Sequence, residues 1–91
     1  MGGLISVRVR GSIVEFLLDD EVVVRIREPS DGELGVALLL MNLIRSDKGL
    51  LKDKNLVAKR LKRVCTSEGF EIPLEAVEKV INKIEIVNGG E

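Results

Sequence analysis

The fold is decided by residues 5–27, which read ISVRVRGSIVEFLLDDEVVVRIR. In this stretch apolar, often β-branched residues alternate with polar or charged residues in three short runs. Gly11-Ser12 separates the first two runs, and Asp19-Asp20-Glu21 separates the last two. A period of two, interrupted by turn residues, predicts three antiparallel strands joined as a meander. The predicted strands span residues 4–10, 13–18 and 22–27.

The loop lengths predict which residues share a face of this sheet. A two-residue Gly11-Ser12 loop pairs Val9 with Val14 and keeps the apolar partners together. A three-residue loop from Asp19 to Glu21 does the same for the second hairpin. The predicted inner face consists of Ile5, Val7, Val9, Val14, Phe16, Leu18, Val22, Val24 and Ile26. The predicted outer face carries Arg8, Arg10, Arg25 and Arg27 around Glu15, with Ile13, Leu17 and Val23 beside them.

Three helices are predicted after the strands, at about 31–45, 53–67 and 73–84. Ser30 and Glu33 fit a capping box at the start of the first helix, and Pro73 suits the first position of the third. Apolar residues surround the first helix except for a narrow gap near Asn42 and Arg45. Such a helix is expected to be buried on all sides.

The expected fold class is therefore α+β, with an N-terminal three-stranded antiparallel β-meander followed by three α-helices packed on one face of the sheet. At 91 residues the chain is expected to be a single domain, residues 1–91. Residues 85–87 either extend the last helix or add a short strand. The tail, residues 88–91, is expected to be frayed.

The composition excludes several classes of function. The chain contains no His and a single cysteine, Cys65, so imidazole-based catalysis, imidazole metal sites and an internal disulfide are impossible. Cys65 lies on the apolar stripe of the second helix, where a buried thiol is expected rather than a nucleophile. No glycine-rich nucleotide-binding motif is present. We expect no enzymatic activity, no cofactor and no bound metal.

The composition also indicates the compartment in which the protein is expected and the kind of organism it comes from. No apolar stretch approaches the length of about 20 residues that spans a bilayer, so no membrane partner is expected. The lone cysteine and the lack of a visible signal peptide favour the cytoplasm. Gln is absent and 32% of residues are charged, a composition typical of thermophiles.

The charge is unevenly distributed although the net charge is only −1. Residues 48–63 hold seven of the 14 Lys and Arg and only one acidic residue. This basic segment contains Lys48, Lys52, Lys54, Lys59, Arg60, Lys62 and Arg63. It is either a solvated face, a site for an acidic protein partner, or a nucleic-acid site together with the outer-face arginines.

Two features weigh against nucleic acid. Phe16 is predicted to be in the core and unable to stack on bases, and the helices do not match a helix-turn-helix. The all-apolar first helix and the open strand edges instead suggest a homodimer or a docking surface for a partner. The alternative is a monomer in which the third helix and the C-terminal segment close the core. We therefore expect a small non-enzymatic interaction or assembly module that forms a homodimer or other homo-oligomer or binds a protein partner. The alternative is a nucleic-acid-binding or regulatory protein.

Overall fold

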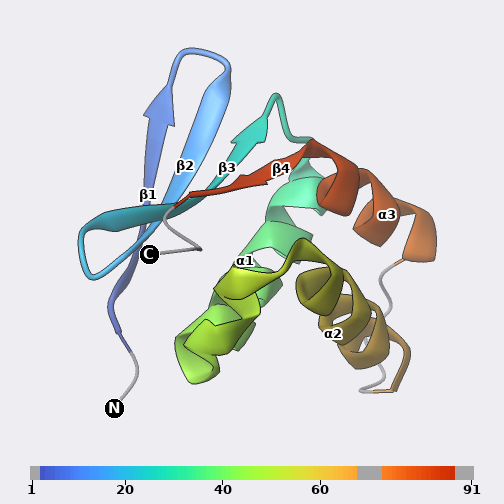
Figure 1. Cartoon of the computed structure of the whole chain (residues 1–91). Coiled ribbons are helices and arrows are strands. Elements are labelled where there is room, and N and C mark those ends of the chain that lie inside the picture. Colours follow the sequence, from blue (N-terminus) through green and yellow to red (C-terminus); the bar gives the residue numbers. More distant parts are fainter. Residues whose placement is uncertain (1–2, 68–72, 88–91) are drawn as a thin grey trace.

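The computed structural model describes residues 3–67 and 73–87, and the α+β fold is confirmed (Figure 1). Four antiparallel strands form one sheet in the order β1-β2-β3-β4. The elements are β1 (Ile5–Arg10), β2 (Ile13–Leu18), β3 (Glu21–Arg27), α1 (Asp31–Ser46), the 3₁₀ helix η1 (Lys48–Lys52), α2 (Lys54–Ser67), α3 (Leu74–Lys83) and β4 (Ile84–Ile86). The predicted helices agree with these bounds to within one residue. The tail expected to be frayed lies outside the described residues.

The first hairpin has the predicted register. Arg10 pairs with Ile13 across the two-residue Gly11-Ser12 turn, and Val9 pairs with Val14. Gly11 has a φ of 63°, a conformation that glycine adopts without steric cost at the first central position of such a turn.

The second hairpin differs from the prediction of a three-residue loop. The turn is Asp19-Asp20, with φ of 52° and 69°, and it places Leu18 opposite Glu21. A β-bulge then restores the expected pairing of Phe16 with Val24, because Val23 has no partner on β2. Val23 is consequently buried in the core, so its predicted place on the outer face was wrong.

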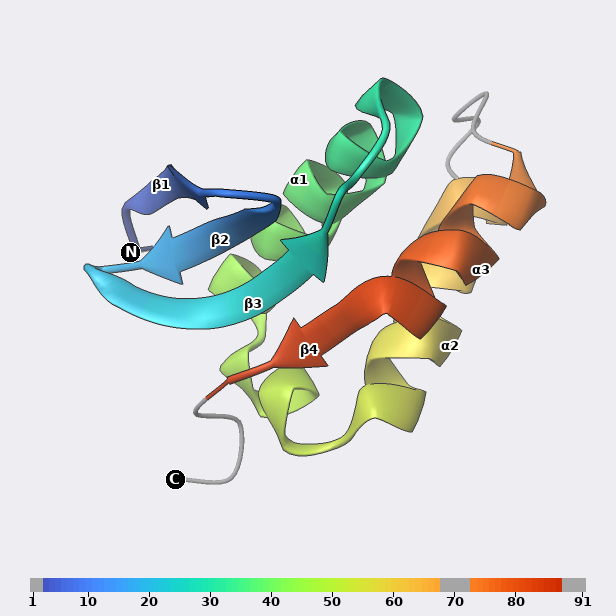
Figure 2. The same ribbon diagram turned by 90° about the horizontal axis from the view of Figure 1, so that it is seen from above.

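Residues 84–86 form a strand, which resolves the alternative left open by the sequence. Ile84 pairs with Ile26 and Glu85 with Arg25, so β4 runs antiparallel along the edge of β3 (Figure 2). The chain therefore returns to the sheet after α3 and adds its last strand beside β3.

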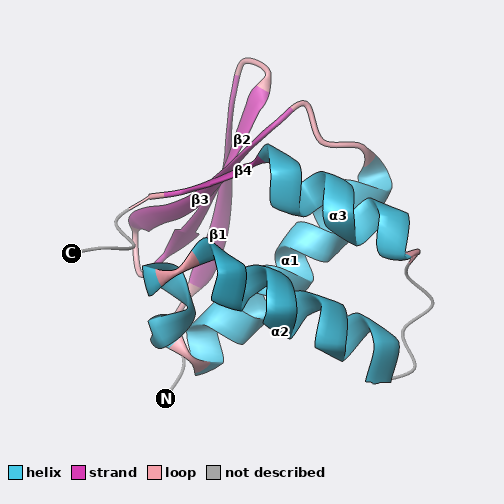
Figure 3. Ribbon diagram, turned by 45° about the vertical axis from the view of Figure 1, so that its right-hand side comes forward, coloured by secondary structure: helices cyan, strands magenta, loops and turns pink. Residues whose placement is uncertain are grey.

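The helices pack on one face of the sheet, as predicted, and the core lies between them (Figure 3). Helix α1 contacts β2, α3 contacts β3, and α2 packs against α1 and α3. Phe16, Val24 and Leu40 are fully buried at this junction. Helix α1 is not buried on all sides: Leu38 is 44% exposed, because the stripe that faces solvent at Asn42 and Arg45 also includes Leu38.

The inner face of β1 is also less covered than predicted. Val7 is 49% exposed and Val9 is 68% exposed, although both belong to the apolar face. Ile5 and Val14 are partly buried against the core. The reason is that the helices pack on β2 and β3, which leaves the edge strand β1 projecting beyond them.

Candidate interaction surfaces

The arginines of the outer sheet face are organised around one buried carboxylate. Glu15, whose side chain is only 4% exposed, accepts from Arg25 Nε at 2.9 Å and from Arg8 Nε at 2.8 Å. These hydrogen bonds, first from Arg25 and then from Arg8, lower the pKa of Glu15 below its ordinary value. Two of the predicted binding arginines are therefore engaged within the fold.

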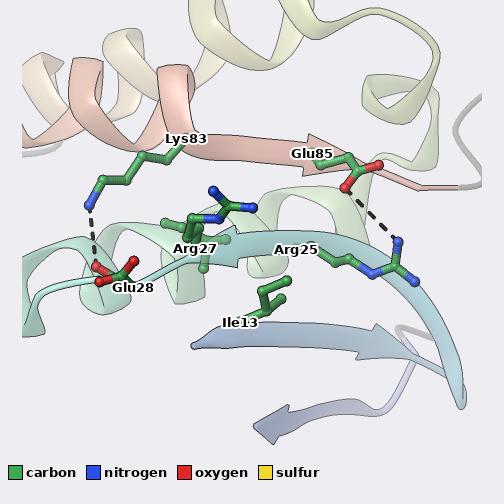
Figure 4. Close-up of a pocket in the computed structure, with 7 residues that line it drawn as sticks. Ile13, Arg25, Arg27, Glu28, Lys83 and Glu85 are labelled. Carbon is green, nitrogen blue, oxygen red and sulfur yellow. Dashed lines mark hydrogen bonds and ion pairs between the residues drawn. The ribbon is translucent and has the colours of Figure 1, made fainter. Parts of the chain in front are cut away.

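A second cluster lies where β3 meets β4, around a hollow of about 570 Å³ (Figure 4). Lys83 Nζ donates to the carbonyl of Glu28 at 3.3 Å and to Glu33 Oε1 at 2.7 Å. Arg25 Nη1 lies 4.0 Å from Glu85 Oε1, and the side chain of Arg27 also lines the hollow. Positive and negative groups alternate here, so the cluster is not a continuous cationic surface. Arg10 is exposed and, like Arg27, is paired in the sheet with Ile13.

Sequence reasoning missed the burial of Glu33. Its backbone N–H donates to Ser30 Oγ at 3.3 Å, as the capping box predicts. Its carboxylate is buried, and the hydrogen bond from Lys83, followed by contacts with Ser30, lowers the pKa of Glu33. No local signal in the sequence could have revealed Lys83, which lies 50 residues away.

The cations of the basic segment have different surroundings in the structure. Lys54 Nζ donates to the carbonyl of Ile84 at 3.2 Å and thereby ties α2 to β4. Lys48 lies beside Asp19 and Glu21 of the β2–β3 turn, where it lines a separate hollow. Lys52 and Lys62 are exposed on the surface.

The other three cations gather around a single depression, which we call the α2 groove. It has a volume of about 340 Å³ and is lined by Asp47, Gly49, Leu50, Leu56, Lys59, Arg60 and Arg63. Leu56, Lys59, Arg60 and Arg63 follow helical spacing and so share one side of α2. Leu56 is 46% exposed, which gives the groove an apolar side chain among the cations.

The free side of β1, which we call the β1 edge, is a second accessible surface. Arg10 and Ile13 flank a two-residue turn, a position where hairpin partners exchange backbone hydrogen bonds. The carbonyl of Leu4 also accepts from the N–H of Asp19 at 2.9 Å. Even-numbered residues of β1 therefore direct their backbone groups toward β2. Ile5, Val7 and Val9 direct theirs away from the sheet.

Three further features bear on possible function: the cysteine, clusters of metal-binding side chains, and helices that could span a membrane. Cys65 is buried, as predicted, and burial raises the pKa of its thiol. Among residues 3–67 and 73–87, no cluster of three or more His, Cys, Asp or Glu is arranged to hold a metal ion. Within the same ranges, no helix is both long enough and apolar enough to cross a membrane.

Comparisons with known proteins add no further assignment: no family model, curated protein or solved structure matches the chain.

Proposed function

We propose that this protein is a homotypic assembly module in which two copies join through their β1 edges. The observation that carries the proposal is the exposure of Val7 and Val9 on β1, an edge strand with no partner strand on its outer side among residues 3–67 and 73–87. Such an edge is a template for a further strand. Pairing two copies produces a continuous sheet of eight strands, four from each copy.

One antiparallel register satisfies both the backbone and the side chains. When Val7 lies opposite Val7 of the second copy, Ile5 lies opposite Val9 of that copy. Each of these residues then exchanges its outward backbone hydrogen bonds with its partner. The exposed valines of both copies form one apolar strip on the helix side of the sheet.

The charges on the outer face of the sheet, which points away from the helices, favour the same register. With Val7 opposite Val7, Arg8 of each copy faces Ser6 of the other. A shift by two residues toward the turn instead places Arg8 directly opposite Arg8, and like charges in this position are destabilising. A shift by one residue sets the apolar face against the arginine face. Because the contact is confined to one six-residue strand, we expect a weak and reversible dimer.

The register is tested by changing the charge at Ser6. Sedimentation equilibrium of the full chain over a concentration series gives the dimer Kd. We expect Ser6→Glu to lower Kd, because the new carboxylate faces Arg8 of the second copy. Ser6→Lys should raise Kd by repulsion. Circular dichroism checks that each variant is folded.

Asn55, an exposed residue at the start of α2, supplies the matched controls. Asn55→Glu and Asn55→Lys introduce the same charges away from β1 and should leave Kd unchanged. A chain that is monomeric up to its solubility limit overturns the proposal. Equal shifts of Kd in the Ser6 and Asn55 pairs overturn it as well.

The alternative function, nucleic-acid binding, has weaker support. Arg8 and Arg25 are held by Glu15, and Lys54 is held by a carbonyl. Phe16, the aromatic residue of the described part of the chain, is fully buried and unavailable to stack on bases. We propose no catalytic activity. The lone cysteine favours assembly in a reducing compartment, and we propose the cytoplasm.

A further inference from the structure

The α2 groove combines features of a docking site for a second kind of partner. Leu56 supplies an exposed apolar side chain, and Lys59, Arg60 and Arg63 line the groove with positive charge. Leu50, which also lines the groove, is itself buried in the core. One acidic residue, Asp47, also lines the groove, and its Oδ1 accepts from the N–H of Gly49 at 3.1 Å. The lining therefore has an excess of positive charge around an apolar side chain.

We propose that the α2 groove binds an acidic protein segment through a Leu-like side chain flanked by carboxylates. The apolar side chain would cover Leu56, which is 46% exposed. The carboxylates would face Lys59 and Arg60. This proposal is independent of assembly through the β1 edge, because the groove is formed by α2 and η1.

The chemistry of the groove favours an acidic peptide over a nucleic acid. A phosphate backbone needs only a track of cations, and it gains nothing from contact with the exposed side chain of Leu56. An acidic segment with an apolar anchor uses both parts of the lining, and complementary charge supplies specificity.

Fluorescence anisotropy tests the proposal with a labelled synthetic peptide that contains Leu pairs flanked by Glu pairs. Two further peptides separate the contributions: one has Gln in place of Glu, and the other has Ser in place of Leu. We expect the first peptide to bind and both altered peptides to bind at least about tenfold more weakly. A labelled duplex DNA of similar charge serves as the competing class of ligand.

Charge reversal on α2 locates the site. Arg60→Glu should weaken peptide binding by about tenfold, since it replaces an attraction by a repulsion. Lys62→Glu makes the same charge change on α2 outside the groove lining and should leave Kd within about twofold at physiological salt. Leu56→Gln should also weaken binding while preserving the salt dependence.

Several outcomes overturn the proposal. These are no binding of the Leu-containing acidic peptide, equal weakening by Arg60→Glu and Lys62→Glu, equal binding of the peptide that lacks Leu, and tighter binding of the duplex. The Kd of self-association, measured separately, shows whether the β1 edge is affected.

Discussion

Truncating two leucines of the same helix separates the buried side of α1 from its exposed stripe. Leu40 is fully buried between the sheet and the other helices, whereas Leu38 is 44% exposed. Both lie near the middle of α1, so Leu40→Ala and Leu38→Ala change the helix propensity in the same way. The difference in free energy of unfolding between the two variants therefore reports how deeply each leucine side chain is buried.

The expected costs differ severalfold. Leu→Ala at a fully buried site lowers the free energy of unfolding by about 3–5 kcal/mol, because it removes apolar contacts and leaves a cavity. For a chain of 91 residues the whole free energy of unfolding is on the order of 5–14 kcal/mol, so Leu40→Ala should remove a large part of it. Leu38→Ala loses only part of a leucine's burial, and we expect a cost of about 1 kcal/mol or less.

Urea unfolding followed by far-ultraviolet circular dichroism measures both values at a protein concentration low enough to keep the chain monomeric. The free energy of unfolding of each variant should depend on urea concentration with the same slope as in the wild type. The variants should differ in the urea concentration at the midpoint of unfolding. If Leu38→Ala costs as much as Leu40→Ala, then α1 is enclosed on all sides and does not have a solvent-facing stripe.

Two further predictions concern titratable groups. Because the folded chain lowers the pKa of Glu15 from its ordinary value of 4.5, the ionised form adds stability above about pH 4.5 that is lost as the pH falls through the lowered value. The difference in free energy of unfolding between wild type and Glu15→Gln should therefore shrink on acidification. Urea titrations at neutral and acidic pH measure this difference, and a larger difference at acidic pH would contradict the prediction. Cys65 is buried and its pKa is raised, so its thiol should react with Ellman's reagent only after unfolding. Rapid reaction of the folded chain would mean that the thiol is accessible.

The periodic part of the fold was predictable from the sequence because local patterns specify it. Alternation defined β1, β2 and β3, and Gly11 marked a turn in which a positive φ is required. The second turn was missed because a three-residue loop and a two-residue turn followed by a bulge both place Phe16 opposite Val24. They differ in the partner of Leu18 and in the face on which Val23 lies. The two-residue turn also needs a positive φ at Asp19 and Asp20, a conformation that Asp tolerates without requiring it.

Coverage of the apolar faces was not predictable, since the pattern identifies an apolar surface but not the element that covers it. The valines of β1 and Leu38 of α1 illustrate this: each belongs to an apolar face, and each is left partly exposed by the placement of the helices. The same limit applies to the candidate sites, because the sequence pattern does not show which distant segments come into contact. The sequence grouped Arg8 and Arg25 around Glu15 correctly, but it could not show that Lys54 reaches Ile84.

The two edges of the sheet differ in a way that bears on the size of the proposed assembly. At one edge, β4 has only three residues, and the carbonyl of Ile84 accepts from Lys54. Short strands and lysines are features that prevent an edge from pairing further. At the other edge, β1 has six residues and directs the backbone groups of Ile5, Val7 and Val9 outward. A contact between two β1 edges is isologous and uses both of them, so the symmetry closes at two copies. Growth into a fibre would need the β4 edge as well, and for that reason we expect a dimer rather than a polymer.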